Sequence, residues 1–197
     1  MNGEHKDEIS PDNALKQILE RLITNVDNWA INTKVLIVFH RGLQNIKVNR
    51  KIYKELKHNE IKLLSYTPKK DTNNISSLTY AKISDKYTNY IKLYLNVNCK
   101  TDILSKGMQK INDDVSKLKS SQILKHYEYF EEIMAKIQDQ FHEATYCRQT
   151  RLFSNVIFML FKDLIKVYKV YYVHIMEILE RFASLEPSDM QKAFLMY

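Results

Sequence analysis

Apolar residues in this chain recur at alternating steps of three and four, the spacing that places side chains on one face of an α-helix. The longest example is residues 151–182, which read RLFSNVIFMLFKDLIKVYKVYYVHIMEILERF. The positions at that spacing are Phe153, Ile157, Leu160, Leu164, Val167, Tyr171, Ile175, Ile178 and Phe182. Further apolar residues of the segment widen this face, namely Val156, Met159, Tyr168, Tyr172, Met176 and Leu179.

A helix that is apolar around most of its circumference has to contact several neighbours, so we predict a central helix over residues 151–182. The same period places charged residues on the opposite side, where they would meet water. These are Lys162, Lys166, Lys169, Glu177 and Glu180. We predict that the remaining helices pack around this segment.

Helical spacing also predicts the elements on both sides of the central helix. Helices are expected at about 10–24, 29–43, 49–57, 77–102 and 121–146, with a short one around 115–118 and a last one from 186 onward. Ser10 and Pro11 suit a helix start as cap and first residue, and Asp27 or Asn28 can cap the second helix. Residues 58–77 contain the only mid-chain proline and are predicted to be mainly a connection.

Composition supports an all-α fold in a single domain. Three Gly and three Pro in 197 residues leave little turn chemistry for a sheet of many strands. We expect residues 1–9 to be flexible and residues 10–197 to form one helical domain. The polar N-terminus does not resemble a signal peptide, and the apolar run 156–161 is far shorter than the roughly 20 residues that span a bilayer. We therefore expect a cytoplasmic, monomeric protein with two unlinked cysteines.

The net charge of +7 is concentrated in one stretch of the chain. Residues 41–70 hold nine basic and two acidic residues, whereas the rest of the chain holds 21 of each sign. Such a field suits an anionic partner, such as phosphoinositide headgroups, an acidic protein or nucleic acid, although a solvated surface has the same composition. The candidate lipid-binding or anion-binding residues are Arg41, Lys47, Arg50, Lys51 and Lys54.

Candidate residues for catalysis are scarce. The six histidines are scattered without metal-ligand spacing, and Gly3, Gly42 and Gly107 are too far apart to form a nucleotide-binding loop. Neither cysteine has a partner in sequence that would activate it. We expect no metal, no cofactor and no enzymatic activity.

Two motifs resemble those of the ANTH domain, the membrane-binding module of clathrin-assembly adaptors. The first is Trp29-x4-Lys34-x-Leu36-x3-His40-Arg41, and the second runs from Phe158 through Phe161-Lys162-Asp163 to Lys166. Between them, Tyr87-Thr88-Asn89-Tyr90 falls where that family has an R-Y-x-x-Y-L helix. The resemblance covers roughly residues 15–197, and it implies structural roles for Trp29, Lys34, Leu36, His40, Phe158, Phe161, Lys162 and Asp163.

The resemblance implies a right-handed α-solenoid, an ENTH/VHS-like superhelix of about seven helices. It also implies binding to phosphatidylinositol 4,5-bisphosphate at the plasma membrane, and a role with clathrin and adaptor complexes in coated pits. The Lys-rich lipid site of the family precedes the Trp helix, but here the start of the chain offers Lys6 beside Glu4, Asp7 and Glu8. We therefore expect a domain truncated at both ends, and carry over no residue for that lipid site.

Two further functions stay open at this stage. One is a helical protein-interaction module that binds an R-SNARE or another amphipathic helix without direct contact with lipid. The other is a nucleic-acid binder, which rests on positive charge alone and is not our expectation.

Overall fold

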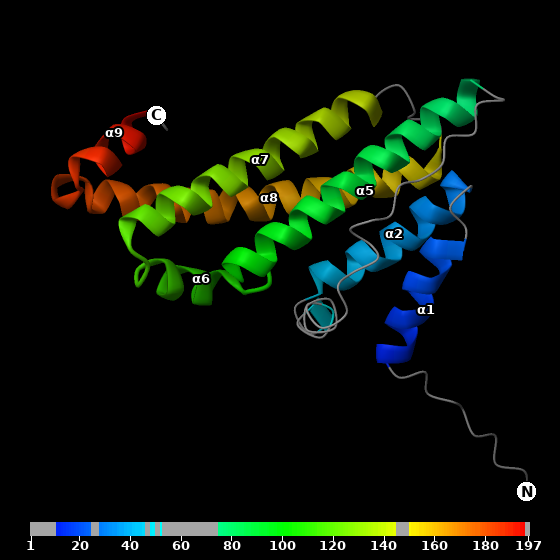
Figure 1. Ribbon diagram of the computed structural model, residues 1–197, viewed down its shortest axis with the longest axis horizontal. Coiled ribbons are helices and arrows are strands. Elements are labelled where there is room, and N and C mark those ends of the chain that lie inside the picture. The colour runs from blue at the N-terminus through cyan, green and yellow to red at the C-terminus, as the bar shows by residue number, and fades with distance from the viewer. Residues whose placement is uncertain are drawn as a thin grey trace, which may run out of the picture.

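The computed structural model describes residues 11–24, 28–45, 48–49, 52, 75–144 and 150–195, and these residues form helices joined by turns. The long helices are α5 (Ile75–Thr101), α7 (Ser120–Ala144) and α8 (Arg151–Glu180). They run along the length of the molecule (Figure 1), and α7 contacts both α5 and α8. No strand occurs in the described ranges, in agreement with the predicted all-α solenoid.

The N-terminal helices close one end of this layer. Helix α1 (Pro11–Thr24) packs on α2 (Trp29–Gln44), and α2 packs in turn on α5 and α8. Helix α2 begins at Trp29 because the side chain of Asn28 accepts hydrogen bonds from the backbone N–H groups of Ala30 and Ile31, both at 3.1 Å. Of the two residues predicted as caps, Asn28 is therefore the one that acts.

Helix α2 ends at Gln44, one residue beyond the predicted end at residue 43, and Gly42 lies within its last turn. Gly42 has no positive φ; a Cβ built at this position would lie 2.8 Å from Cδ1 of Ile52. The glycine therefore lets residue 52 approach the helix closely. Most of the predicted helix at 49–57 and of the connection at 58–77 lies outside the described residues, as do residues 1–9.

The polar stretch after α5 corrects the sequence prediction. Asp102 follows the helix with φ of 52°, a left-handed conformation that suits the end of a helix. The short helix then spans Met108–Val115 (α6), and residues 116–119 form a turn where a helix at 115–118 had been expected. Ile111 and Val115, four residues apart, are both fully buried, which fixes the start of α6 earlier than the sequence suggested.

The C-terminal part follows the predicted boundaries closely. Helix α8 ends at Glu180, a short 3-10 turn, η2, covers Phe182–Ser184, and α9 spans Pro187–Leu195. Helix α9 turns back onto α7 at one end of the molecule (Figure 1). Helix α8 contacts α2, α6 and α7, as expected for a central helix.

Candidate functional site: a buried polar cluster and an exposed face of α8

Helices α2, α5 and α8 meet at a buried cluster of polar side chains. His40 from α2, Asp163 from α8 and Tyr90 from α5 lie together with Tyr87 and Gln44, and the first four are between 0% and 2% exposed. Nε2 of His40 donates to Oδ2 of Asp163 at 2.5 Å, since a carboxylate can only accept. The Tyr90 hydroxyl donates to the same oxygen at 2.5 Å, and Nε2 of Gln44 donates to Oδ1 at 2.7 Å.

Two tyrosines of this cluster are held in their neutral form. Tyr87 lies 2.8 Å from Nδ1 of His40, which accepts from its hydroxyl when Nε2 carries the ring proton. Burial, followed by the nearby charge of Asp163, raises the pKa of both Tyr87 and Tyr90 well above the ordinary value. Both therefore remain hydrogen-bond donors, and Asp163 links α2, α5 and α8 through three donors.

This arrangement of His, Asp and Tyr residues superficially resembles a catalytic site, but its burial gives it a structural role. The polar atoms are directed at one another across three helices, and the side chains of His40 and Asp163 are 0% and 2% exposed. A reacting group would need a position next to these atoms that a substrate can reach. The cluster instead fixes the relative positions of the helices.

The tryptophan of the first motif belongs to an aromatic stack at the other end of α2. The Trp29 ring stacks on Tyr80 with a centroid distance of 4.8 Å and on Phe153 at 5.9 Å. Leu36, from the same motif, is fully buried in the core. These two residues thus join α2 to α5 and α8, so they act on packing rather than on a ligand.

The basic candidates are only partly within the described residues. Arg41 lies exposed in the last turn of α2, and Lys34 is exposed two turns earlier on the same helix. The other four candidates, Lys47, Arg50, Lys51 and Lys54, lie outside the described residues. The structure therefore presents Arg41 to solvent at the start of the basic stretch.

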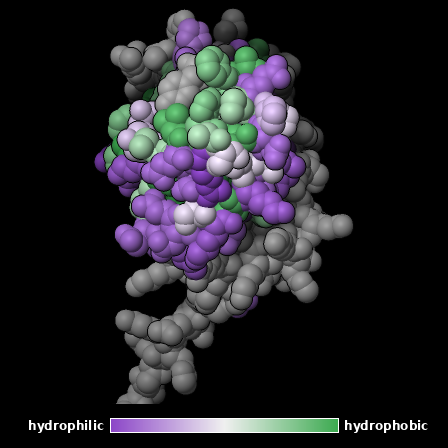
Figure 2. Space-filling model, turned by 90° about the vertical axis from the view of Figure 1, so that its left-hand side faces the viewer, coloured by the Kyte–Doolittle hydropathy of each residue, from purple (hydrophilic) through white to green (hydrophobic). Residues whose placement is uncertain are grey.

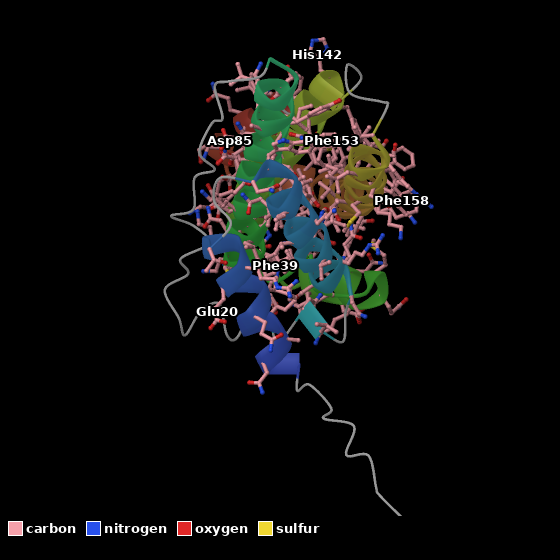
Figure 3. All side chains as sticks on the ribbon, turned by 90° about the vertical axis from the view of Figure 1, so that its right-hand side faces the viewer. Glu20, Phe39, Asp85, His142, Phe153 and Phe158 are labelled. Atoms are coloured by element: carbon pink, nitrogen blue, oxygen red, sulfur yellow. The ribbon has the colours of Figure 1, made fainter. Side chains whose placement is uncertain are left out.

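A row of apolar side chains faces solvent along α8. Phe158, Phe161, Tyr168 and Tyr172 are between 52% and 61% exposed, and Ile165 and Leu179 are about two-fifths exposed. We call these six residues the α8 stripe. Figure 3 shows Phe158 projecting from the outer side of α8, whereas Phe153 points into the bundle. Nζ of Lys162 lies over the Phe158 ring, 4.6 Å from its centroid.

The spacing of the α8 stripe is that of a coiled-coil seam. With the partly buried Ile175 added, the positions 158, 161, 165, 168, 172, 175 and 179 alternate steps of three and four. Because an α-helix has 3.6 residues per turn, such a row drifts by about 20° per heptad around the helix axis. A second helix can follow that drift by supercoiling, whereas a flat surface cannot.

Further apolar side chains lie at the α9 end. Phe194 and Leu195 are 75% and 83% exposed, and Met176 and Leu179 are exposed near the end of α8. Figure 2, which looks at this end, shows apolar side chains gathered in its upper part and hydrophilic ones below them. The exposed apolar residues at the ends of α8 and α9 therefore make this end of the molecule unusually apolar for a surface.

The structure confirms the predicted main face of α8 and corrects its width. Phe153, Leu160, Val167 and Ile178 are buried as predicted, and so are Val156 and Met159. Tyr168, Tyr172, Met176 and Leu179 had been expected to contact neighbouring helices, yet they face solvent. The buried face widens instead toward Val170 and His174, and it includes Asp163. Lys166, expected in water, is half-buried and its Nζ donates to the backbone oxygen of Leu104. Asp163 turns this face inward because its three donors are in the core.

Gln44 and the exposure of the α8 stripe are the features that sequence reasoning missed. Spacing alone could not reveal this exposure, because the core-facing row from Phe153 to Tyr171 alternates steps of three and four in the same way. Gln44 gave no signal either, since its role depends on Asp163, 119 residues away.

Neither a metal centre nor a membrane-spanning helix is evident in the part of the chain that the structure describes. No three side chains of His, Cys, Asp or Glu come together there as metal ligands would. None of the described helices combines the length and the apolar character needed to cross a bilayer.

Comparison with known proteins identifies one family. A family model, the ANTH domain, matches residues 8–197, which is nearly the whole chain. A search of curated proteins found no match.

Proposed function

This chain belongs to the ANTH domain family of endocytic adaptor modules, and from that premise we propose that it binds phosphatidylinositol 4,5-bisphosphate at the plasma membrane and takes part in clathrin coat assembly and vesicle budding. The observation that carries the proposal beyond the family is the charge distribution. The whole excess of +7 falls within residues 41–70, and the described residue at its start, Arg41, is exposed. Each basic residue near an anionic leaflet contributes about 1 kcal/mol of binding free energy.

The proposed setting is the cytoplasmic side of clathrin-coated pits, with the domain acting as a monomer. Clathrin and adaptor complexes would be partners of the full-length protein. Their binding motifs are short peptide segments, and the sequence contains none of the DPF, NPF or DLL type. The role of the domain itself is therefore attachment to the membrane.

Vesicle binding tests this function directly. Vesicles of phosphatidylcholine with and without phosphatidylinositol 4,5-bisphosphate are sedimented with the protein, and bound protein is measured. We expect binding to increase with phosphoinositide content and to fall at least tenfold when Lys47, Arg50, Lys51 and Lys54 are all changed to Glu. Unchanged binding by that variant would remove the basic stretch from the proposal, and no binding by the unmodified protein would remove the function.

The α8 stripe favours a second function, the binding of an amphipathic helix such as that of an R-SNARE. The stripe offers heptad spacing over about three heptads, and the exposed Lys162 and Lys169 lie on its flank. A helix with apolar residues at matching positions and acidic residues on one side would complement this surface. Unlike lipid binding, such an interaction needs no membrane.

A lipid-free binding measurement separates the two functions. The cytosolic part of an R-SNARE is titrated against the protein, and against a variant with Ile165→Glu and Tyr172→Glu. Binding of the R-SNARE that is at least tenfold weaker in the variant supports the helix site. Lys136→Glu on α7 serves as the control and should bind like the unmodified protein. Equal binding by the protein and the variant would rule out the α8 stripe.

A further inference from the structure

Three lysines project from α6 and the turn that follows it. Lys110 lies on α6, and Lys117 and Lys119 lie in the turn at 116–119, all three exposed. We call them the α6 edge. None of them forms an ion pair with another described residue. In Figure 2 the lower part of the described surface, where Figure 1 places α6, is hydrophilic.

Two of the three acidic residues around this edge are paired with one partly buried lysine. Residues 100–125 contain six lysines and three aspartates, a net charge of +3. Two of the aspartates pair with Lys106, at 3.3 Å for Asp102 and 2.8 Å for Asp114. The pKa of Asp114 is lowered mainly by the hydrogen bond from Lys106, and the positive charges of Lys110 and Lys117 lower it further. The ammonium groups of the α6 edge are therefore left to face solvent.

The α6 edge lies on the same side of the molecule as the start of the basic stretch. Nδ2 of Asn49, just after α2, donates to the backbone oxygen of Ser105, just before α6, at 3.4 Å. Arg41 occupies the last turn of α2. In Figure 1 the end of α2 and helix α6 both lie along the lower side of the molecule, whereas α7 runs along the upper side.

The opposite side carries the opposite charge. Residues 128–143 of α7 hold five acidic residues against Lys136, a net charge of −4. Four of the acidic residues are exposed in the structure, namely Glu128, Glu131, Glu132 and Asp139. The domain therefore carries positive charge on the α6 side and negative charge on the α7 side. A molecule with such a charge separation takes a preferred orientation near a charged surface.

We propose that the α6 edge is a second contact with an anionic bilayer, so that the domain lies with α6 and the end of α2 toward the lipid and with α7 away from it. This inference rests on the proposed lipid-binding function and adds an orientation to it. Lysines within about 10 Å of an anionic leaflet are attracted at moderate ionic strength, and they require no headgroup-specific pocket. The contribution of the α6 edge therefore depends on the charge of the bilayer rather than on the identity of the headgroup.

A pair of matched charge reversals tests the orientation. The variant K110E/K117E/K119E and the control K82E/K136E/K192E lower the net charge equally, from +7 to +1. Binding is measured on phosphatidylserine vesicles and on phosphatidylinositol 4,5-bisphosphate vesicles of equal surface charge, and circular dichroism confirms that each variant is folded. We expect the α6-edge variant to bind at least tenfold more weakly on both vesicle types, and the control to change less than threefold.

Equal weakening by the two variants would overturn the proposed orientation, because total charge alone would then explain the loss. The proposed orientation would also be overturned if the α6-edge variant bound vesicles tightly while the variant of Lys47, Arg50, Lys51 and Lys54 lost vesicle binding. That result would leave the proposed function in place. If the unmodified protein binds neither vesicle type, the proposed function fails as well.

Discussion

At the scale of single residues, the position of α8 depends on Asp163. Its carboxylate accepts from His40, Tyr90 and Gln44, which come from α2 and α5. A buried charge is tolerated only where donors compensate for its lost hydration. The rotation of α8 that buries Asp163 therefore also decides which apolar residues of the helix remain in water.

Replacing Asp163 by Asn should reduce the free energy of unfolding by about 3 kcal/mol or more, because the amide cannot accept from all three donors and leaves buried groups unpaired. Tyr90→Phe, which removes one hydroxyl, should cost about 1–2 kcal/mol. Urea unfolding measures both. The neighbouring exposed Lys162→Gln should stay within about 0.5 kcal/mol. A loss under 1 kcal/mol for Asp163→Asn would contradict the structural role assigned to the cluster.

A histidine pair between α7 and α8 makes stability depend on pH. Nδ1 of His126 lies 3.4 Å from Nε2 of His174. The other ring nitrogen of His174, Nδ1, donates to the backbone oxygen of Val170 at 2.8 Å. Burial lowers the pKa of His174 to about 4, and burial together with Lys125 lowers the pKa of His126. Both rings are therefore neutral in the folded protein at neutral pH.

As pH falls below about 6.5, His174 takes up a proton in the unfolded chain but not in the folded one, so the unfolded state binds more protons. We expect the folded protein to lose on the order of 3 kcal/mol from this residue between pH 7 and pH 4. Urea unfolding at a series of pH values measures the loss, and His174→Gln should remove most of it, whereas His142→Gln, at an exposed position, should not. Identical pH dependence of the His174 variant and the unmodified protein would disprove this assignment.

At the scale of elements, the turn that follows α6 is held in place by a side chain from the C-terminal end of α8. Helix α6 is eight residues long, too short to be stable alone. Arg181, just beyond α8, donates through Nη1 to the backbone oxygen of Leu118 and through Nη2 to that of Ser116, both at 2.6 Å. Its guanidinium also pairs with Glu177, which holds the side chain in position.

Arg181→Ala should destabilise the protein by about 2 kcal/mol, since charged donors to the carbonyl groups of Ser116 and Leu118 are lost. Arg181→Lys should recover less than half of that loss, because an ammonium group lacks the planar fork. Thermal or urea unfolding gives the free energies, and hydrogen exchange should show faster opening of α6. Lys192→Ala, at an exposed position on α9, is the control. Unaltered exchange in α6 would show that the arginine does not hold this helix.

At the scale of the whole molecule, charge and apolar surface are separated. Among the described residues, Arg41 lies at the end of α2, three exposed lysines form the α6 edge, exposed acidic residues lie on α7, and exposed apolar side chains lie on α8 and α9. In the proposed orientation, the surface with α6 and the end of α2 faces the membrane while the α8 stripe stays available to a helix. The two proposed functions need not compete.

Binding to anionic vesicles should weaken more than tenfold when NaCl is raised from 0.1 M to 1 M, because the Debye length shortens from about 10 Å to about 3 Å. Sedimentation at the two salt concentrations measures this. The lipid-free binding of an R-SNARE helix, which buries apolar surface, should change far less. Vesicle binding that resists high salt would indicate insertion of apolar side chains in place of the charge contact proposed.

The helices themselves were largely predictable from the order of residues. Periodicity and caps are local properties, so Asn28 and the alternating apolar positions determined where α2, α5, α7 and α8 run. The short helix was predicted too far along the chain. The buried Ile111 and Val115 lie within α6, whereas residues 116–119 form a turn in which the backbone oxygens of Ser116 and Leu118 accept from Arg181. The basic stretch was also visible in the sequence, whereas its relation to Lys110, Lys117 and Lys119 was not.

By itself, the sequence determined an all-helical chain, the concentration of its charge and, through two motifs, its resemblance to the ANTH family. Only the tertiary structure decided how far the buried face of α8 extends around the helix, because Asp163 is buried by donors that α2 and α5 contribute from positions more than 70 residues away. A periodic pattern specifies that a helix has an apolar face, but the number of neighbours determines how much of that face is covered. The α8 stripe is the part that no described neighbour covers.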